Sequence, residues 1–97
     1  MVLKVVWTKR AYNNFEKTID YLNENWSLNV SKEFAYKVFS SIDTIKFFPR
    51  IGKLENKERL ILGLVISKNT SIFYRFDSEF LYILNVFDNR LSPNKRV

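Results

Sequence analysis

The chain has 97 residues, of which 46% are hydrophobic and 16% aromatic, and it contains only two glycines and two prolines. This composition excludes a disordered or low-complexity protein, and the length predicts one domain, residues 1–97, with one modest core. The net charge is +6 and both cysteine and histidine are absent, which excludes a disulfide framework, a thiolate or histidine metal site and a histidine general base.

The first predicted elements are a short strand and a helix. Residues 2–7 are mostly apolar but far too short for a signal sequence or a membrane span, so we expect a cytoplasmic protein that makes no membrane contact. Thr8 fits a helix N-cap. The apolar stripe that follows recurs at helical spacing, in Ala11, Phe15, Thr18, Leu22 and Trp26.

A second helix is predicted after a short turn. Ser27 or Ser31 can cap it, and Pro49 forbids its continuation. Its buried stripe consists of Val30, Phe34, Val38, Ile42 and Ile45. Residues 49–58 mix proline, glycine and charged side chains without any periodicity, and we predict a loop there.

The last part of the chain reads as three strands, at residues 59–66, 70–76 and 80–87, joined by short polar turns. Such short connections imply antiparallel hairpins. The predicted fold is therefore α+β, in the order β-α-α-β-β-β, with the helical hairpin packed on one face of an antiparallel sheet.

These strands carry apolar residues on both faces. We expect one set to face the helices, namely Leu60, Leu62, Leu64 and Ile66. The other face would then expose Ile61, Val65, Phe73, Leu81, Ile83 and Phe87. Either a partner or a second copy covers that face, or the sheet curls enough to bury both faces in part.

The positive charge is concentrated in the second half of the chain. Residues 1–45 carry six Lys or Arg and five Asp or Glu, whereas residues 46–97 carry ten and five. This half ends in Asp88, Asn89 and Arg90, followed by Lys95 and Arg96. Two interpretations are open: a solvated, solubilising surface, or a basic face for nucleic acid or an acidic partner.

Several short motifs, in this order, resemble the RelE/ParE superfamily of bacterial type II toxin–antitoxin, or plasmid stabilisation, toxins. They are Trp7-Thr8-x-x-Ala11, Tyr21-Leu22 before Asn25-Trp26, Phe48-Pro49-x-x-Gly52, Tyr74-Arg75 and Asp88-Asn89-Arg90. The resemblance covers the chain from Val2 to about Lys95. It implies no cofactor and a cognate antitoxin that forms a hetero-oligomer with the toxin. Ile61, Phe73 and Ile83 are our expected antitoxin contacts on the uncovered face.

Within the superfamily, the two long helices and Arg75 favour the ParE-like side, whose members act on DNA gyrase. The expected target-binding residues are then Arg75, Asn89, Arg90, Lys95 and Arg96. The sequence departs from the ParE-like pattern after Phe87, because it lacks a histidine there and has one arginine where two are frequent. Asp88 is expected to orient Arg90 rather than to act as an acid.

The alternative is a RelE-like endonuclease that cleaves mRNA on the ribosome. Arg59, Arg75 and Arg90 would then stabilise the charge on the phosphate, with Lys53, Lys57 and Tyr82 as further candidates. Residues 91–97 contain neither the tyrosine nor the histidine often found there in RelE-like toxins. The sequence thus leaves open whether the protein is an enzyme. A third interpretation is a degenerate, non-toxic module that binds an antitoxin or nucleic acid.

Overall fold

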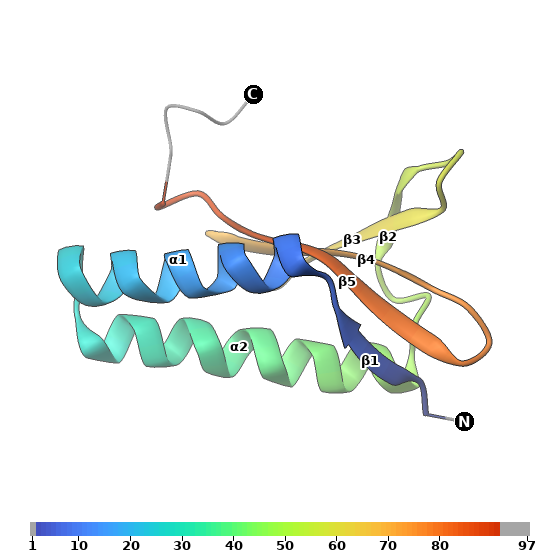
Figure 1. The fold of residues 1–97 in the computed structure, drawn as a ribbon, viewed down its shortest axis with the longest axis horizontal. Coiled ribbons are helices and arrows are strands. Elements are labelled where there is room, and N and C mark those ends of the chain that lie inside the picture. The colour runs from blue at the N-terminus through green and yellow to red at the C-terminus, as the bar shows by residue number, and fades with distance from the viewer. Residues whose placement is uncertain (1, 92–97) are drawn as a thin grey trace.

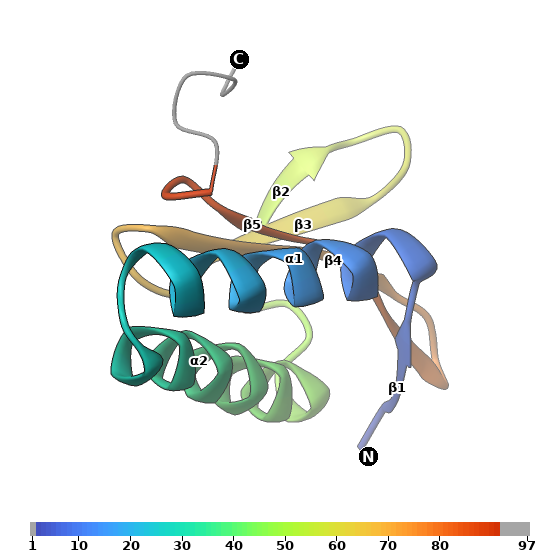
Figure 2. The ribbon, with the colours of Figure 1, turned by 60° about the vertical axis from the view of Figure 1, so that its left-hand side comes forward.

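The computed structural model describes residues 2–91. Its elements in chain order are β1 (Lys4–Trp7), α1 (Lys9–Asn25), α2 (Leu28–Phe47), β2 (Lys53–Asn56), β3 (Ile61–Val65), β4 (Thr70–Phe76) and β5 (Phe80–Asp88) (Figure 1). The strands form one sheet in the order β1-β5-β4-β3-β2. Both helices lie on the same side of it (Figure 2). The predicted α+β class and the helical hairpin on one face are confirmed.

Two details of the sheet differ from the prediction. The expected loop at residues 49–58 contains β2, whose four residues are all exposed and show no apolar alternation. This strand exists because it pairs antiparallel with β3, which is a tertiary cause that leaves no local signal. The sheet is also mixed, because β1 pairs parallel with β5, with Val5 opposite Leu81.

The helices follow the predicted stripes except at Trp26, which follows the end of α1 and is 57% exposed. Of the two serines that could cap the second helix, Ser27 is the cap and Ser31 lies inside α2. Thr8 accepts a hydrogen bond from the backbone N–H of Ala11, and Ser27 accepts one from that of Val30. The core between helices and sheet is formed by the buried side chains of Leu3, Ala11, Leu22, Phe34, Val38, Ile42, Ile45, Ile72, Tyr74, Leu81, Ile83 and Val86. An aromatic group of Trp7, Phe15, Phe34 and Phe39 extends this core along the side of the hairpin.

Helix α1 runs beside β5 beyond the point where β1 ends. The Thr8 hydroxyl donates to the carbonyl oxygen of Ile83 at 2.8 Å, and the Asn14 amide donates to the side-chain oxygen of Asn85 at 2.6 Å. The start of α1 therefore contacts the same strand as β1, and β5 is held from both sides along its length.

Tyr74 fixes the linker between α2 and β2. Its side chain is fully buried, and its hydroxyl donates to the carbonyl oxygen of Pro49 at 2.8 Å and accepts from the Gly52 N–H at 2.9 Å. Burial raises the pKa of the Tyr74 phenol, so the hydroxyl keeps the proton that it donates to Pro49. The linker is thus tied to the middle of the sheet.

Gly52→Ala should destabilise the protein. A Cβ at this position would lie 2.6 Å from the Tyr74 hydroxyl and 3.0 Å from the Gly63 carbonyl oxygen, and neither atom can move freely. Overpacking of this kind costs about 1–3 kcal/mol in free energy of unfolding, which urea denaturation would measure. Gly63→Ala is the comparison variant, since its Cβ would meet two side chains of the uncovered face and no backbone atom, namely Glu55 at 2.9 Å and the Phe73 ring at 3.1 Å. Equal losses for both variants would contradict this account.

Among the described residues, no helix is both long and apolar enough to span a membrane.

Candidate functional site

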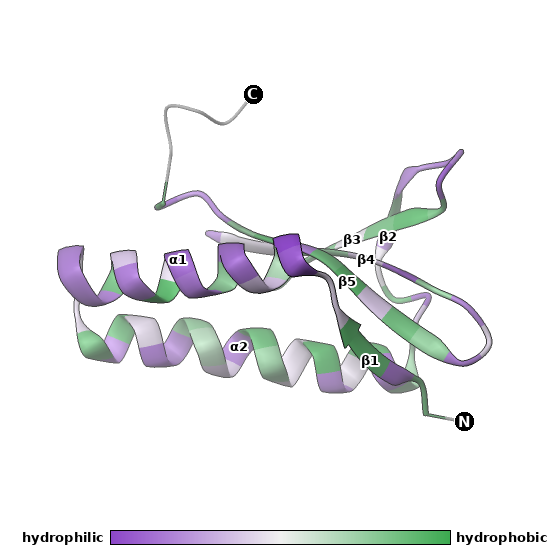
Figure 3. Ribbon diagram, viewed as in Figure 1, coloured by the Kyte–Doolittle hydropathy of each residue, from purple (hydrophilic) through white to green (hydrophobic). Residues whose placement is uncertain are grey.

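The face of the sheet turned away from the helices carries the candidate site. The strand register places Arg75 opposite Tyr82 and Phe73 opposite Gly63 on this face. Val65 is 73% exposed there, whereas Phe73 is half-buried. Figure 3 shows that β3 is largely hydrophobic, and that the connection between β2 and β3 is hydrophilic. The uncovered face is therefore apolar along its strands and charged at its rim.

A hollow of about 650 Å³ opens on this face. We call it the basic hollow, and it is lined by Thr8, Glu58, Arg59, Leu60, Ile61, Arg75, Tyr82 and Leu84. The β2–β3 connection forms one wall and the paired strands β4 and β5 form the floor. Leu60 in this wall has φ 56°, in the left-handed region that leucine rarely adopts. Strain of this kind is concentrated at functional sites.

Arg75 lies over the ring of Tyr82, with its guanidinium carbon 5.3 Å from the ring centroid. The Tyr82 hydroxyl donates to the Asp77 carboxylate at 3.4 Å. Backbone N–H groups of Phe80 and Glu79 donate to the same carboxylate and hold the pKa of Asp77 below its usual value. Burial and the Asp77 charge raise the pKa of Tyr82, so its phenol is protonated at neutral pH.

Arg59 reaches the same hollow from the β2–β3 connection. Its backbone N–H donates to the side-chain oxygen of Asn56 at 2.9 Å, which fixes the turn, while its side chain is exposed. Two guanidinium groups and a protonated phenol thus line one concavity together with the Glu58 carboxylate. The positive charges outnumber the negative one, which favours an anionic or acidic ligand. The structure brings together Arg59, Arg75 and Tyr82 from the sequence-predicted set.

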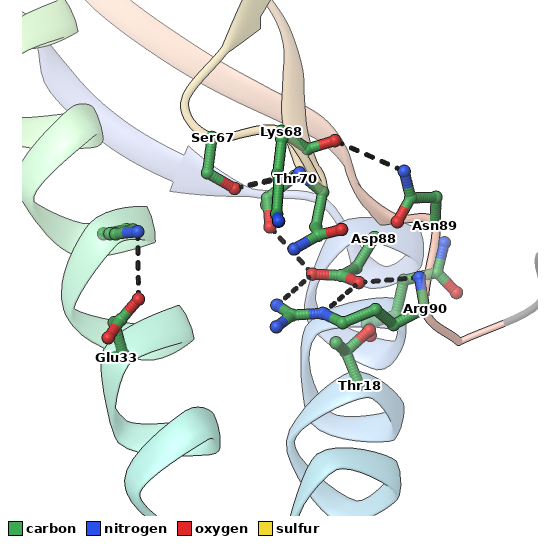
Figure 4. Close-up of polar contacts among 11 residues, drawn as sticks. Thr18, Glu33, Ser67, Lys68, Thr70, Asp88, Asn89 and Arg90 are labelled. Carbon is green, nitrogen blue, oxygen red and sulfur yellow. Dashed lines mark hydrogen bonds and ion pairs between the residues drawn. The ribbon is translucent and has the colours of Figure 1, made fainter. Parts of the chain in front are cut away.

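Arg90 lies at the opposite end of β5, in a separate cluster. Its guanidinium donates two hydrogen bonds to Asp88, at 2.9 and 3.0 Å, and its backbone N–H donates a third at 2.9 Å (Figure 4). The Thr70 hydroxyl donates to the same buried carboxylate at 2.7 Å. Arg90 also lies over the ring of Trp26, 5.7 Å from its centroid. The expectation that Asp88 orients Arg90 agrees with this geometry.

These contacts explain the charge state of the pair. Burial alone would raise the pKa of Asp88, but the hydrogen bonds from Arg90 and Thr70 outweigh it and hold that pKa below its usual value. The hydrogen bonds to Asp88 raise the pKa of Arg90 in turn. Only 17% of the Arg90 side chain is exposed. The arginine that the sequence suggested for the target is therefore already committed to an internal partner.

Two further expected target residues lie elsewhere. Asn89 is held against the β3–β4 turn, where its backbone N–H donates to the carbonyl oxygen of Asn69 at 2.9 Å. Lys95 and Arg96 lie outside the described residues.

The expected antitoxin contacts are placed on both faces, which corrects one assignment. Ile61 and Phe73 are half-buried on the uncovered face, as expected, but Ile83 is fully buried against the helices, as is Leu81. The error came from applying one odd–even rule to all strands. The register pairs Ile83 with Tyr74, so odd residues of β5 share a face with even residues of β4.

A bulge in β5 and the β2–β3 connection explain the positions of Phe87 and Leu60. The register shifts between Phe73 and Tyr74, leaving Leu84 unpaired in β5, so Phe87 returns to the uncovered face where it was expected. Leu60 was expected to face the helices, but it precedes β3 and is 64% exposed. Nothing in the sequence signals its left-handed conformation, because leucine rarely adopts it. Asp88 and Thr70 lacked a signal as a pair, because the register alone brings them together.

No cluster of three or more potential metal ligands occurs within residues 2–91.

Comparison with known proteins agrees with the fold and with the family that the sequence resembles. Residues 5–90 match the family described as the ParE toxin of the type II toxin-antitoxin system, parDE. The fold is similar to a chain from the chromosomal ParDE toxin–antitoxin system of P. aeruginosa, with a TM-score of 0.74 and 10% sequence identity. That match covers 90% of this chain and 96% of the other. No curated protein matches the chain in sequence.

Proposed function

The chain belongs to the ParE toxin family of type II toxin–antitoxin systems, and from this membership we propose that it inhibits DNA gyrase and is neutralised by a cognate antitoxin. The observation that carries the proposal is the family match across residues 5–90. The basic hollow supports it, because it offers fixed positive charge on the face that the helices leave open.

We place the target contact at the basic hollow rather than at Arg90. Arg75 and Arg59 are exposed and line this hollow, whereas Arg90 is committed to the buried Asp88. A charged side chain without an internal partner can bind a new one without breaking an existing pair. Asn89, which follows β5, stays in the proposal as a secondary contact, as do Lys95 and Arg96, which lie outside the described residues.

A supercoiling assay tests the gyrase proposal. Purified protein added to gyrase, relaxed plasmid and ATP should stop supercoiling and cause linear DNA to accumulate, because the inhibitor would trap the cleaved complex. A Lys17→Ala variant, which loses one exposed charge on α1 far from the hollow, should act like the wild type. Unchanged supercoiling at a large excess of toxin would remove gyrase as the target.

The contents of the hollow favour one second candidate, a ribosome-dependent mRNA endonuclease. Arg59 and Arg75 can hold a phosphate, and the protonated Tyr82 phenol is the candidate donor to a leaving oxygen, although its raised pKa makes it a weaker acid. Arginine remains protonated and is a poor general base. The register places Lys53 opposite Gly63, so its ammonium adds a positive charge to the same face.

Primer extension on mRNA from translating ribosomes separates the two candidates. The endonuclease predicts cuts within A-site codons that require the ribosome, whereas the gyrase inhibitor predicts none. Expression of the chain alone in a bacterium tests both against a degenerate, non-toxic module, which would not arrest growth.

A further inference from the structure

A second apolar surface adjoins the basic hollow at Leu60 and extends to the end of α2 and the linker between α2 and β2 (Figure 1). We call it the apolar groove and define it by Phe47, Phe48, Ile51, Leu54 and Leu60. These side chains are 57%, 65%, 50%, 47% and 64% exposed. Isolated exposed apolar residues are ordinary, but five of them within fourteen positions of sequence mark an interaction surface.

The groove is formed by two adjoining hollows that share Arg50. It consists of one hollow of about 560 Å³ lined by Phe47, Phe48, Pro49, Arg50 and Ile51, and another of about 430 Å³ lined by Arg50, Gly52, Leu54, Leu60, Leu62 and Phe76. Arg50 belongs to both, and its guanidinium lies over the Phe76 ring at 5.6 Å. The Tyr74 hydroxyl ties the linker from beneath. A ligand would therefore bind without ordering this backbone, which favours affinity.

The charge around the groove restricts what can bind it. Arg50 lines both hollows of the groove, and residues 46–59 as a whole carry five Lys or Arg and two Glu, of which Glu58 and Arg59 line the basic hollow. A second copy of the chain would bring the same excess of positive charge against itself, which opposes association. Nucleic acid would match the charge but not Ile51, Leu54 and Leu60, because bases stack on aromatic rather than aliphatic side chains. The complementary ligand is a protein segment with an apolar stripe and acidic flanks.

Building on the proposed function, we infer that an apolar segment of the antitoxin, flanked by Asp and Glu, docks in the apolar groove. This assigns the antitoxin mainly to the end of α2 and to β2, instead of to the face that carries Phe73. Ile61 can take part only at the margin, because it lines the neighbouring basic hollow.

The location of the groove also suggests how neutralisation reaches the target site. Leu60 lines both the apolar groove and the basic hollow. It is the left-handed residue of the β2–β3 connection and directly follows Arg59 in the chain. A segment packed against Leu60 therefore contacts the wall that presents Arg59. Docking in the groove would in this way change the shape of the hollow.

The test uses the full chain and any small acidic protein found to be encoded beside its gene, accepted as the antitoxin only if its co-expression relieves growth arrest. Leu54→Asp and Ile51→Asp should each raise the dissociation constant about 30-fold or more, the scale for losing a central hot spot. Association should slow as salt is added, because the flanking charges steer it. Val65→Asp is the matched control, since Val65 is more exposed and lies on the other face. Circular dichroism and thermal melting verify that each variant is folded.

A cellular readout distinguishes docking from loss of folding. Leu54 lies outside the basic hollow, so Leu54→Asp should still arrest growth when expressed alone, yet escape relief by the antitoxin. Unchanged binding by folded Leu54→Asp and Ile51→Asp would overturn the inference, as would an equal loss for Val65→Asp. Self-association or RNA binding weakened by the same variants would overturn it in favour of a second copy or of nucleic acid. Failure of the acidic protein to relieve the arrest would count against the proposed function instead.

Discussion

Arg90→Ala should lower the free energy of unfolding by about 3 kcal/mol, which is the lower end of the cost of breaking a buried ion pair. The variant leaves the Asp88 carboxylate, which is 0% exposed, without its guanidinium partner. The lower end applies because Asp88 keeps the Thr70 hydroxyl and one backbone N–H as donors. Urea denaturation at neutral pH measures the loss, with Arg10→Ala, an exposed arginine on α1, as the control.

The same pair predicts how the loss depends on pH. The folded pKa of Asp88 lies below its unfolded value, so the pair contributes its full stability above the unfolded pKa of about 4. That contribution is lost as the pH falls through the folded pKa. In Arg90→Ala, burial without the guanidinium raises the pKa of Asp88, and protonation relieves the buried charge. The difference in free energy of unfolding between the wild type and Arg90→Ala should therefore decrease as the pH falls.

A double variant isolates the charge from the packing of Arg90 on Trp26. Adding Asp88→Asn to Arg90→Ala removes the buried charge, so the double variant should be more stable than Arg90→Ala alone near pH 7. Its difference from the wild type should change less with pH than that of the single variant. If Arg90→Ala lowered the free energy of unfolding by less than about 0.5 kcal/mol, the range of ordinary surface substitutions, Arg90 would not have the structural role inferred here.

Sequence reasoning succeeded where a local pattern decides the structure. The stripes from Ala11 to Leu22 and from Phe34 to Ile45 predicted the two helices, because a period of 3.6 residues is visible in one segment. The caps at Thr8 and Ser27 were visible for the same reason. The sequence did not predict the strand β2, because its residues are all exposed and only its pairing with β3 holds it in place.

The candidate site shows the same division. Arg59, Arg75 and Tyr82 could be named from their residue types, but their meeting depends on the register of β4 with β5 and on the path of the β2–β3 connection. Arg90 was grouped with them because it follows a strand, although β5 carries it to the far end of the sheet. The face of the sheet on which Ile83 lies depends on the residue with which it pairs, and the length of the hairpin does not predict that pairing.

The largest functional effect should come from Arg75. Arg75→Ala removes an exposed guanidinium and its contact with the Tyr82 ring while leaving the core untouched, so stability should change by less than about 1 kcal/mol. Growth arrest on expression should be strongly weakened. If the protein cleaves mRNA, the ribosome-dependent rate should fall by about 10²–10⁴, the scale for losing a charge-stabilising group.

Arg75→Lys and Arg59→Ala refine this prediction. Lysine keeps the charge but not the planar group that stacks on Tyr82, so Arg75→Lys should recover only part of the activity. Arg59→Ala should weaken the same activity, gyrase inhibition or mRNA cleavage, that Arg75→Ala weakens, because both residues line one hollow. Lys17→Ala controls for the general loss of positive charge. If Arg75→Ala and Arg59→Ala both kept full toxicity, while charge removal at Lys95 and Arg96 abolished it, the target would bind beyond the end of β5 and not at the basic hollow.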